Sequence, residues 1–159
     1  MNQSKNGDDA PILSALDVFE MAISYLARRD HAEGELREKL RRKSVDDALI
    51  DEAFADLRER DYLNDARFAE LQGAILARKG WGPMQIAHKL SARGINQALI
   101  AESLAMIEQE TSWFELCQKR FEAKFGALAR LTPKERQKAY RYLTHRGFAG
   151  AVIRQVIFA

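Results

Sequence analysis

The sequence predicts an all-α protein of three tandem three-helix repeats that form an elongated, curved array. The segment YLARRDHAEGELREKL at residues 25–40 is echoed fifty positions later by ILARKGWGPMQIAHKL at residues 75–90. Only three prolines and nine glycines interrupt the 159 residues, which favours long helices. No segment alternates between apolar and polar residues for long enough to indicate a strand.

A third, weaker copy follows the first two. LSARGI at residues 90–95 returns as LTHRGF at residues 143–148, shifted by 53 positions. Three small helices cannot bury much surface alone, so neighbouring copies are expected to stack and share a core. The expected organisation is a flexible N-terminal tail at residues 1–12 and repeats at residues 13–62, 63–111 and 112–159.

Apolar residues with helical spacing predict three helices in the first repeat. Such residues recur three, four or seven positions apart and therefore share one face of a helix. The stripes are Leu16, Phe19, Ile23 and Leu26; Leu36 and Leu40; and Ile50, Phe54 and Leu57.

The second repeat is expected to open with a helix that buries Phe68, Leu71 and Ile75. Pro83 suits the first turn of its next helix, where the missing N–H group has no partner to lose.

Helix ends are also marked in the sequence. Gly94 and Gly147 suit a helix C-terminus, where a left-handed residue is needed. The segments 112–115 (S-x-x-E) and 132–135 (T-P-x-E) match capping boxes, in which two side chains satisfy the free N–H groups of a first turn.

The sequence contains no pattern typical of a catalytic or metal site. It lacks a Gly-rich phosphate loop, the paired histidines of zinc proteases and a nucleophile elbow. The three histidines stand singly, and the one cysteine, Cys117, lies among apolar residues, which favours a buried role. The carboxylates of residues 46–56 are more typical of an exposed acidic helix face than of a catalytic pair. We expect a protein that is not an enzyme and uses no cofactor or metal.

Composition points to a soluble protein of the cytoplasm. Hydrophobic residues make up 47% and charged residues 30% of the chain, as in folded globular proteins. No apolar run approaches the ~18 residues that a membrane-spanning helix needs. The first residues lack the apolar core of a secretion signal. We expect a monomer with no membrane partner.

The net charge of +2 is unevenly distributed. Residues 46–112 carry a net charge of −5, whereas residues 113–159, with ten basic and three acidic side chains, carry +7. A basic final third is a candidate surface for an anionic partner. A solvated helix face would explain the same charges.

Basic side chains also recur at equivalent positions of the repeats. Arg28-Arg29 and Arg78-Lys79 close the first helices of two repeats, where positive charge also stabilises a helix C-terminus by about 0.3–1 kcal/mol. The second helix is basic in all three copies, which suits phosphates or an acidic protein face. Its basic residues are Arg37, Lys39, Arg41, Arg42 and Lys43; Lys89 and Arg93; and Lys134, Arg136, Lys138, Arg141 and Arg146.

Aromatic residues interleave with these cations. Trp81 follows Lys79-Gly80 at a turn and is either an exposed binding anchor or a side chain packed on the adjoining repeat. Tyr140 and Tyr142 flank Arg141, as in proteins that stack on bases, although adjacent helical residues face different directions.

Four blocks of the chain together resemble the RecX family of bacterial recombination regulators. They are YLARRDHAEGELREKL, DARFAE at residues 65–70, KGWGPMQIAHKLSARGI at residues 79–95 and QKAYRYLTHRGF at residues 137–148. The similarity runs from about residue 15 to the end of the chain, with the blocks in the order of the family.

The resemblance implies three tandem three-helix repeats that bind the filament of the RecA recombinase. Such proteins lodge in the helical groove of the filament across neighbouring subunits, dampen its ATPase and strand-exchange activities and block its growth. Many also bind single- or double-stranded DNA weakly, and the family has no catalytic residues. Its apolar motif positions, expected to be core, fall on Leu26, Leu36, Leu40, Phe68, Ile86, Leu90, Ile95, Leu143 and Phe148.

The candidate partner-binding residues combine the family's motif positions with the basic and aromatic pattern. They are Arg28, Arg29, Arg37, Arg78, Lys79, Trp81, Lys89, Arg93, Lys138, Arg141 and Arg146. The leading interpretation is a negative modulator of the RecA filament that acts by binding. Two alternatives stay open: a helical-repeat DNA-binding module that competes for DNA, and a structural adaptor for another protein.

Overall fold

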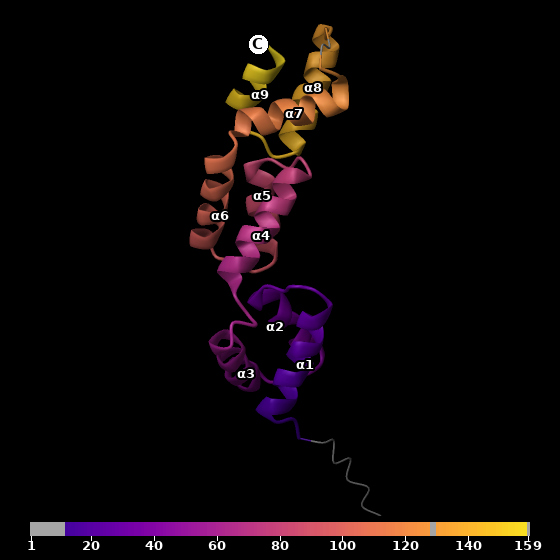
Figure 1. Cartoon of the computed structure of the whole chain (residues 1–159). Coiled ribbons are helices and arrows are strands. Elements are labelled where there is room, and N and C mark those ends of the chain that lie inside the picture. Colours follow the sequence, from indigo (N-terminus) through magenta and orange to yellow (C-terminus); the bar gives the residue numbers. More distant parts are fainter. Residues whose placement is uncertain (1–11, 128–129, 159) are drawn as a thin grey trace, which may run out of the picture. The chain divides into compact units, whose positions relative to one another are not determined.

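The computed structural model describes residues 12–127 and 130–158, and these form nine helices and no strand (Figure 1). The predicted flexible tail falls on residues 1–11, outside the described residues, and on Ile12. The helices are α1 (Ala15–Arg28), α2 (Glu33–Arg42), α3 (Asp47–Glu59), α4 (Asp65–Arg78), α5 (Pro83–Ala92), α6 (Gln97–Glu110), α7 (Trp113–Phe125), α8 (Pro133–His145) and α9 (Gly150–Ile157). The expected all-α fold of three three-helix repeats is confirmed.

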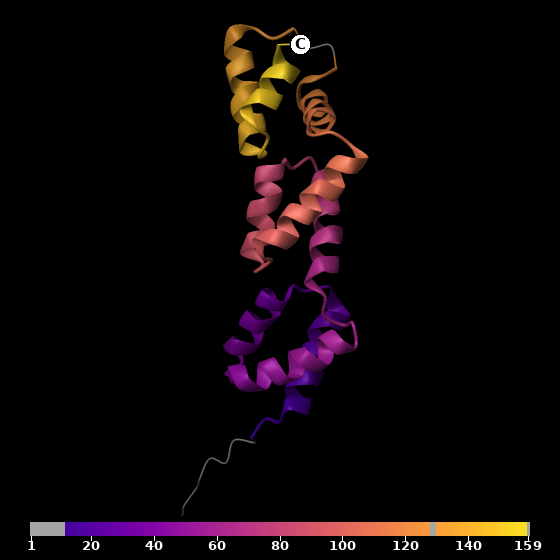
Figure 2. The same cartoon turned by 90° about the vertical axis from the view of Figure 1, so that its left-hand side faces the viewer.

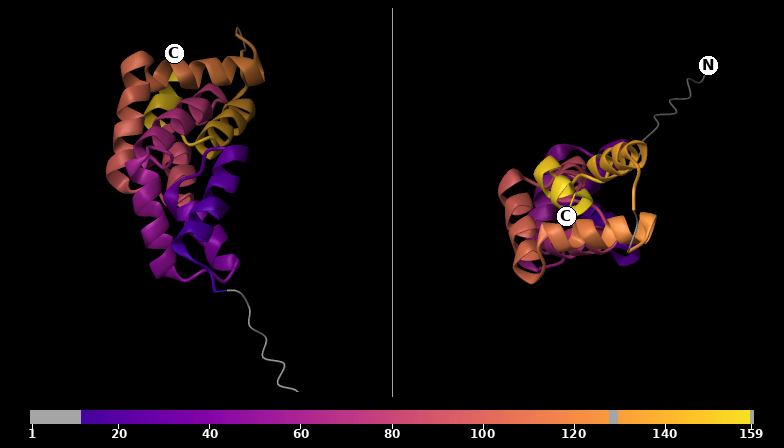
Figure 3. Two further views of the ribbon diagram at one scale, coloured as in Figure 1. Left: turned by 60° about the horizontal axis from the view of Figure 1, so that its bottom comes forward. Right: turned by 90° about the horizontal axis from the view of Figure 1, so that it is seen from above.

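The chain divides after Leu63 into two compact units. The first unit contains the first repeat, α1–α3, and the second contains the second and third repeats, α4–α6 and α7–α9. In the first unit α1 packs mainly against α3 (Figure 1). In the second unit α4 packs against α6, α8 lies beside α9 (Figure 2), and α7 packs against α9 (Figure 3).

The core of the first repeat contains the predicted residues of α2 and α3, but the buried face of α1 differs from the prediction. Leu16 is 64% exposed, whereas Val18 and Ala22 are fully buried. Both sets of residues have helical spacing, and α1 therefore carries a wide apolar arc. Its middle faces the core, and Phe19 and Ile23 pack at the margin of the core.

The buried face of α4 was also predicted wrongly. Phe68 is buried, but Leu71 is 50% exposed and Ile75 is exposed as well. The face that meets α6 is built instead around Gly73, where a Cβ atom would collide with the Ser103 hydroxyl. Small side chains let two helices approach closely, and the Ser103 Oγ then donates a hydrogen bond of 2.8 Å to the Ala69 carbonyl. The close approach of α4 to α6 therefore decides which face of α4 is buried, and the larger side chains of Leu71 and Ile75 stay exposed.

The predicted helix ends are confirmed. Pro83 occupies the first turn of α5, and both capping boxes are formed, at the starts of α7 and α8. Gly94 and Gly147 have φ angles of +83° and +95°. In the first repeat the equivalent position is Ser44, which adopts φ +61° although it has a side chain. The same left-handed turn thus follows the second helix of each repeat.

Equivalent positions of the three repeats carry equivalent core residues. Leu40, Leu90 and Leu143 are all fully buried, and the residues five positions further on, Val45, Ile95 and Phe148, are buried as well. Cys117 is buried as expected, and burial raises the pKa of its thiol to about 12. The full set of apolar motif positions is buried apart from Leu26, which packs at the margin of the first core.

Leu90→Ala should lower the free energy of unfolding by about 2–5 kcal/mol, because it leaves a cavity at a site that solvent does not reach. The matched control is Leu71→Ala on the exposed side of α4, which should cost well under about 1 kcal/mol. Urea denaturation followed by circular dichroism measures both. Equal losses from the two variants would contradict the assignment of the buried faces.

Candidate partner-binding surface

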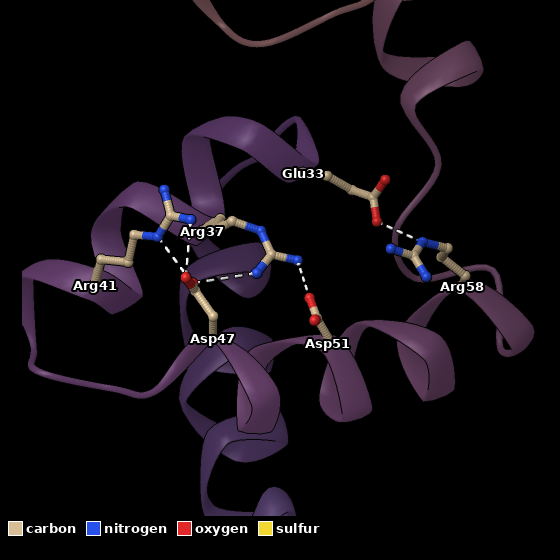
Figure 4. A network of polar contacts seen from close by, with 6 residues as sticks. All are labelled: Glu33, Arg37, Arg41, Asp47, Asp51 and Arg58. Carbon is tan, nitrogen blue, oxygen red and sulfur yellow. Dashed lines mark hydrogen bonds and ion pairs between the residues drawn. The ribbon is translucent and has the colours of Figure 1, made fainter.

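In the first repeat, two basic residues of α2, Arg37 and Arg41, are paired with acidic residues of the same repeat (Figure 4). The Arg37 guanidinium lies 3.4 Å from an Asp47 oxygen and 2.5 Å from an Asp51 oxygen, and its Cζ atom stands 5.2 Å from the centroid of the Phe54 ring. Arg41 forms a second ion pair with Asp47, at 2.8 Å. These contacts join α2 to the start of α3.

The pairing changes the protonation equilibria of both partners. The Arg41 guanidinium lowers the pKa of the Asp47 carboxyl, and Asp47 in turn raises the pKa of Arg41. A carboxylate in the first turn of α3 also interacts favourably with the helix dipole. The basic second helix therefore has a structural role in this repeat, and Arg37 as a partner-binding residue stays a prediction.

The first helix of this repeat ends at two candidate residues. Arg28 is exposed in the last turn of α1, while Arg29 forms a two-pronged ion pair with Glu35, with distances of 3.1 and 2.9 Å. Next to them His31 is buried, and burial lowers the pKa of its imidazole. Its Nδ1 lies 2.9 Å from the Arg29 carbonyl, and its Nε2 lies 2.8 Å from the Lys39 ammonium. Since an ammonium can only donate, the ring accepts at Nε2 and donates from Nδ1.

The second and third repeats are joined by backbone hydrogen bonds between helix ends. The start of α5 has no side-chain cap. Its free N–H groups are satisfied by the turn after α8: the Gly82 N–H donates to the Arg146 carbonyl at 2.7 Å and the Met84 N–H to the Gly147 carbonyl at 3.0 Å. A Cβ atom on Gly82 would lie 2.5 Å from the Gly147 carbonyl carbon, so this contact requires glycine.

The Arg146 side chain caps the opposite helix end. It donates to the Lys79 carbonyl at 2.6 Å and to the Gly80 carbonyl at 3.1 Å, at the C-terminus of α4. Its Cζ atom lies 3.7 Å from the centroid of the Trp81 ring, and the Lys89 ammonium lies 4.2 Å from the same centroid. Of the two alternatives for Trp81, packing on the adjoining repeat is the one that the geometry supports.

Residues that the sequence analysis missed extend this arrangement onto α7. Arg120 donates a hydrogen bond of 2.6 Å to the Tyr142 hydroxyl, and its Cζ atom lies 5.6 Å from the Tyr142 ring centroid. The Lys124 ammonium lies 5.5 Å from the same centroid. We call the whole group the cation–aromatic cluster: Trp81, Lys89, Arg120, Lys124, Tyr142 and Arg146.

The cluster gathers four positively charged side chains in a small region. Among the described residues, no ion pair joins any of its four cations to an acidic side chain. Burial lowers the pKa of Arg146, and the nearby Arg120 charge lowers it further. Aromatic faces and backbone carbonyls compensate these cations only in part. The cluster is therefore electrostatically suited to an anionic partner.

The remaining candidates lie at the surface of the second unit. Arg78 and Lys79 are exposed at the end of α4, next to the carbonyls that Arg146 binds, and Lys138 and Arg141 are exposed on α8. Arg93, at the end of α5, is partly buried. The structure thus brings together Lys79, Trp81, Lys89 and Arg146 from the predicted set.

The described part of the chain holds neither a metal-binding cluster nor a membrane-spanning helix. No group of three or more His, Cys, Asp or Glu side chains is arranged there to hold a metal ion. None of the helices described is both long and apolar enough to cross a membrane.

Three family models match the chain in succession. They describe the first, second and third three-helix domains of RecX and match residues 19–57, 64–104 and 110–157. The chain belongs to the RecX family.

Curated relatives and solved structures agree with the RecX assignment. The chain is 35% identical over 140 residues to a protein of Pseudomonas fluorescens named Regulatory protein RecX, with 88% of this chain and 89% of the relative covered. A protein of the same name from Vibrio parahaemolyticus is 36% identical, with 88% and 87% covered. The fold matches the crystal structure of RecX from Lactobacillus salivarius with a TM-score of 0.78 at 21% identity, covering 91% of this chain and 94% of that one.

Arg146→Ala should lower the free energy of unfolding by about 2–3 kcal/mol, because two charge-assisted hydrogen bonds to helix-end carbonyls are lost. In a Trp113→Phe background, which leaves Trp81 as the one tryptophan of the chain, the emission spectrum should also change. The matched control is Arg141→Ala, an exposed arginine on α8, the helix that Arg146 follows; this variant should stay within about 0.5 kcal/mol. The capping role would be refuted if urea denaturation gave both variants the same stability and both kept the original emission.

Proposed function

We propose that this protein binds the nucleoprotein filament of the RecA recombinase and inhibits its ATPase, strand-exchange and filament-extension activities. The observation that carries the proposal is the succession of three RecX domains over residues 19–157, together with close relatives named as regulatory proteins. Such a protein would act as a monomer in the cytoplasm and would regulate homologous recombination and the SOS response during DNA repair.

The proposed mechanism is binding without chemistry. A filament exchanges between states that differ in activity, and a ligand that prefers one state shifts the population toward it. A chain of repeats can touch neighbouring filament subunits at once, because the first helices of two of its repeats end in a pair of basic residues, Arg28-Arg29 and Arg78-Lys79. Binding across subunits would favour the state that does not extend, and no catalytic residue is required for this effect.

The exposed end of α4 is the part of the surface that we propose for the first contact. Arg78 and Lys79 project from a helix end whose carbonyls are fixed by Arg146. Side chains on a fixed helix end lose less freedom on binding than side chains on a mobile loop. Positive charge at this place is suited to acidic residues of a protein partner.

A DNA-binding module that competes for DNA is the second candidate function. The observation that favours it is the cation–aromatic cluster, in which cations without carboxylate partners alternate with aromatic rings. Phosphates and bases are the ligands that such surfaces bind in proteins that hold single-stranded nucleic acid. This function predicts an affinity for bare DNA that falls steeply with salt.

The two functions are separated by one titration. ATP hydrolysis by RecA on single-stranded DNA is measured while this protein is added at fixed salt, and binding to the same DNA without RecA is followed in parallel. Inhibition well below the concentrations that coat bare DNA is the expected result. Inhibition that appears only where the DNA itself is covered would support competition for DNA instead.

The double variant Arg78→Glu/Lys79→Glu should weaken this inhibition by about tenfold or more, because it places negative charge where an acidic partner would dock. Both side chains are exposed, so the variant should fold normally. The matched control is Arg42→Glu/Lys43→Glu, which reverses the charge of another exposed Arg-Lys pair, at the end of α2, and should leave inhibition unchanged. Full inhibition by the first variant, or equal loss in both, would exclude this helix end as the contact.

A further inference from the structure

Helix α8 presents two parallel stripes on its outward side. Pro133, Gln137 and Tyr140 follow one another at helical spacing and form the first stripe. Lys134, Lys138 and Arg141 follow the same spacing one position later and form the second, and all three are exposed. Residues three or four positions apart lie on the same side of a helix, so a mainly apolar stripe, in which Gln137 carries an amide, runs beside a basic one.

The apolar stripe is hollowed. A cavity of about 320 Å³ is lined by Pro133, Gln137 and Tyr140, by Arg136 of the same helix and by Phe158, which follows α9. The Arg136 Cζ atom lies 5.4 Å from the centroid of the Phe158 ring. Phe158 is 62% exposed, so one wall of the hollow is a large apolar side chain facing solvent. The cavity is of a size to take one large side chain.

Positive charge flanks the hollow on both sides. Arg136 stands on one side and the basic stripe on the other, and each of these cations is exposed. The single carboxylate of α8, Glu135, caps the helix and accepts a hydrogen bond of 2.7 Å from the Thr132 N–H. Because this carboxylate is engaged at the helix end, the outward side of α8 remains strongly basic.

We propose that this hollow is a docking site for an acidic peptide segment that carries one large apolar side chain. The apolar side chain would enter the hollow beside Phe158, and the flanking carboxylates would meet Arg136 and the basic stripe. This arrangement resembles the way in which extended peptides use one buried anchor and several surrounding charges.

The chemistry of the hollow favours a peptide over a nucleic acid. A nucleobase carries several hydrogen-bonding atoms along its edge, and the hollow offers only the Gln137 amide, the Arg136 guanidinium and the Tyr140 hydroxyl beside apolar walls. The Tyr140 hydroxyl is turned toward Gly150, where a Cβ atom would lie 2.6 Å from it. Burying a base would leave polar atoms without partners, which is unfavourable, whereas an apolar side chain has none to satisfy.

Both parts of the site are needed for measurable affinity. Exposed cations contribute little individually because water and salt screen them. Burial of one large side chain adds a contribution that salt does not weaken. The proposal therefore predicts binding that depends on the apolar residue and on the acidic residues together. It does not depend on the identity of the filament partner, because the site is defined by α8 and Phe158 alone.

The test uses the full chain and fluorescein-labelled peptides measured by fluorescence anisotropy. The first probe is a short peptide of Glu and Asp with one central Phe, and the second is the same peptide with Ser in place of Phe. We expect the Phe peptide to bind and the Ser peptide to bind at least about tenfold more weakly. Phe158→Ser and Arg136→Gln should each reduce the affinity for the Phe peptide.

The matched control is Arg60→Gln, which removes an exposed arginine at the end of α3 and should leave peptide binding unchanged. If Phe158→Ser does not give the normal circular-dichroism spectrum, Lys138→Gln in the basic stripe replaces it and should likewise reduce the affinity for the Phe peptide. Equal binding of the Phe and Ser peptides, or no binding, would overturn the proposal. Displacement of the peptide by a thymidine oligonucleotide that binds more tightly would identify nucleic acid as the occupant and would overturn it as well. Loss of peptide binding with intact inhibition of RecA would leave the proposed function untouched.

Discussion

The reciprocal capping of helix ends between the second and third repeats is the interaction on which the second unit depends. Each end of a helix leaves backbone groups without partners, and burying them unpaired is unfavourable. Here the turn after α8 supplies carbonyls to the first N–H groups of α5, and the Arg146 side chain of that turn reaches the carbonyls of Lys79 and Gly80, which directly follow α4. One short segment thus satisfies two helix ends of the neighbouring repeat.

The close contact between these helix ends explains why glycine stands at positions 82 and 147 and arginine at position 146. A Cβ atom on Gly82 would collide with the backbone of Gly147, and one on Gly147 would collide with the backbone nitrogen of Gln85. Arginine suits position 146 because its planar fork reaches two carbonyls at once and stacks on the Trp81 ring, whereas an ammonium would act as a point charge. The positive charge at the end of α4 also complements the helix dipole.

The same constraint produces the electrostatic character of the surface. Fixing Arg146 near Arg120 places two like charges close together, and burial and this repulsion both lower the pKa of Arg146. Aromatic rings offset part of the cost, and a bound anion would offset more. In the first repeat, Arg37 and Arg41 of α2 are instead paired with carboxylates of α3. The basic residues of the second helices therefore have different contacts: ion pairs within the first repeat, and aromatic rings and backbone carbonyls between the second and third repeats.

Much of the fold could be predicted because its signals are local or periodic. The capping boxes and the left-handed glycines are each set by a few neighbouring residues, and the repeats recur at a nearly constant shift; all were confirmed in the structure. The buried face of α4 was missed because small residues around Gly73, rather than Leu71, decide how closely α6 approaches. The pairing of Arg120 with Tyr142, which are 22 positions apart, arises from helix packing and leaves no pattern in the sequence.

The most direct test of the proposed regulation is hydrogen exchange of this protein with and without RecA filaments on single-stranded DNA. The account predicts slower exchange at the end of α4 and the following turn, around residues 76–82, when filaments are present and little change with the same DNA alone. Unchanged exchange with filaments, or equal protection by bare DNA, would contradict it.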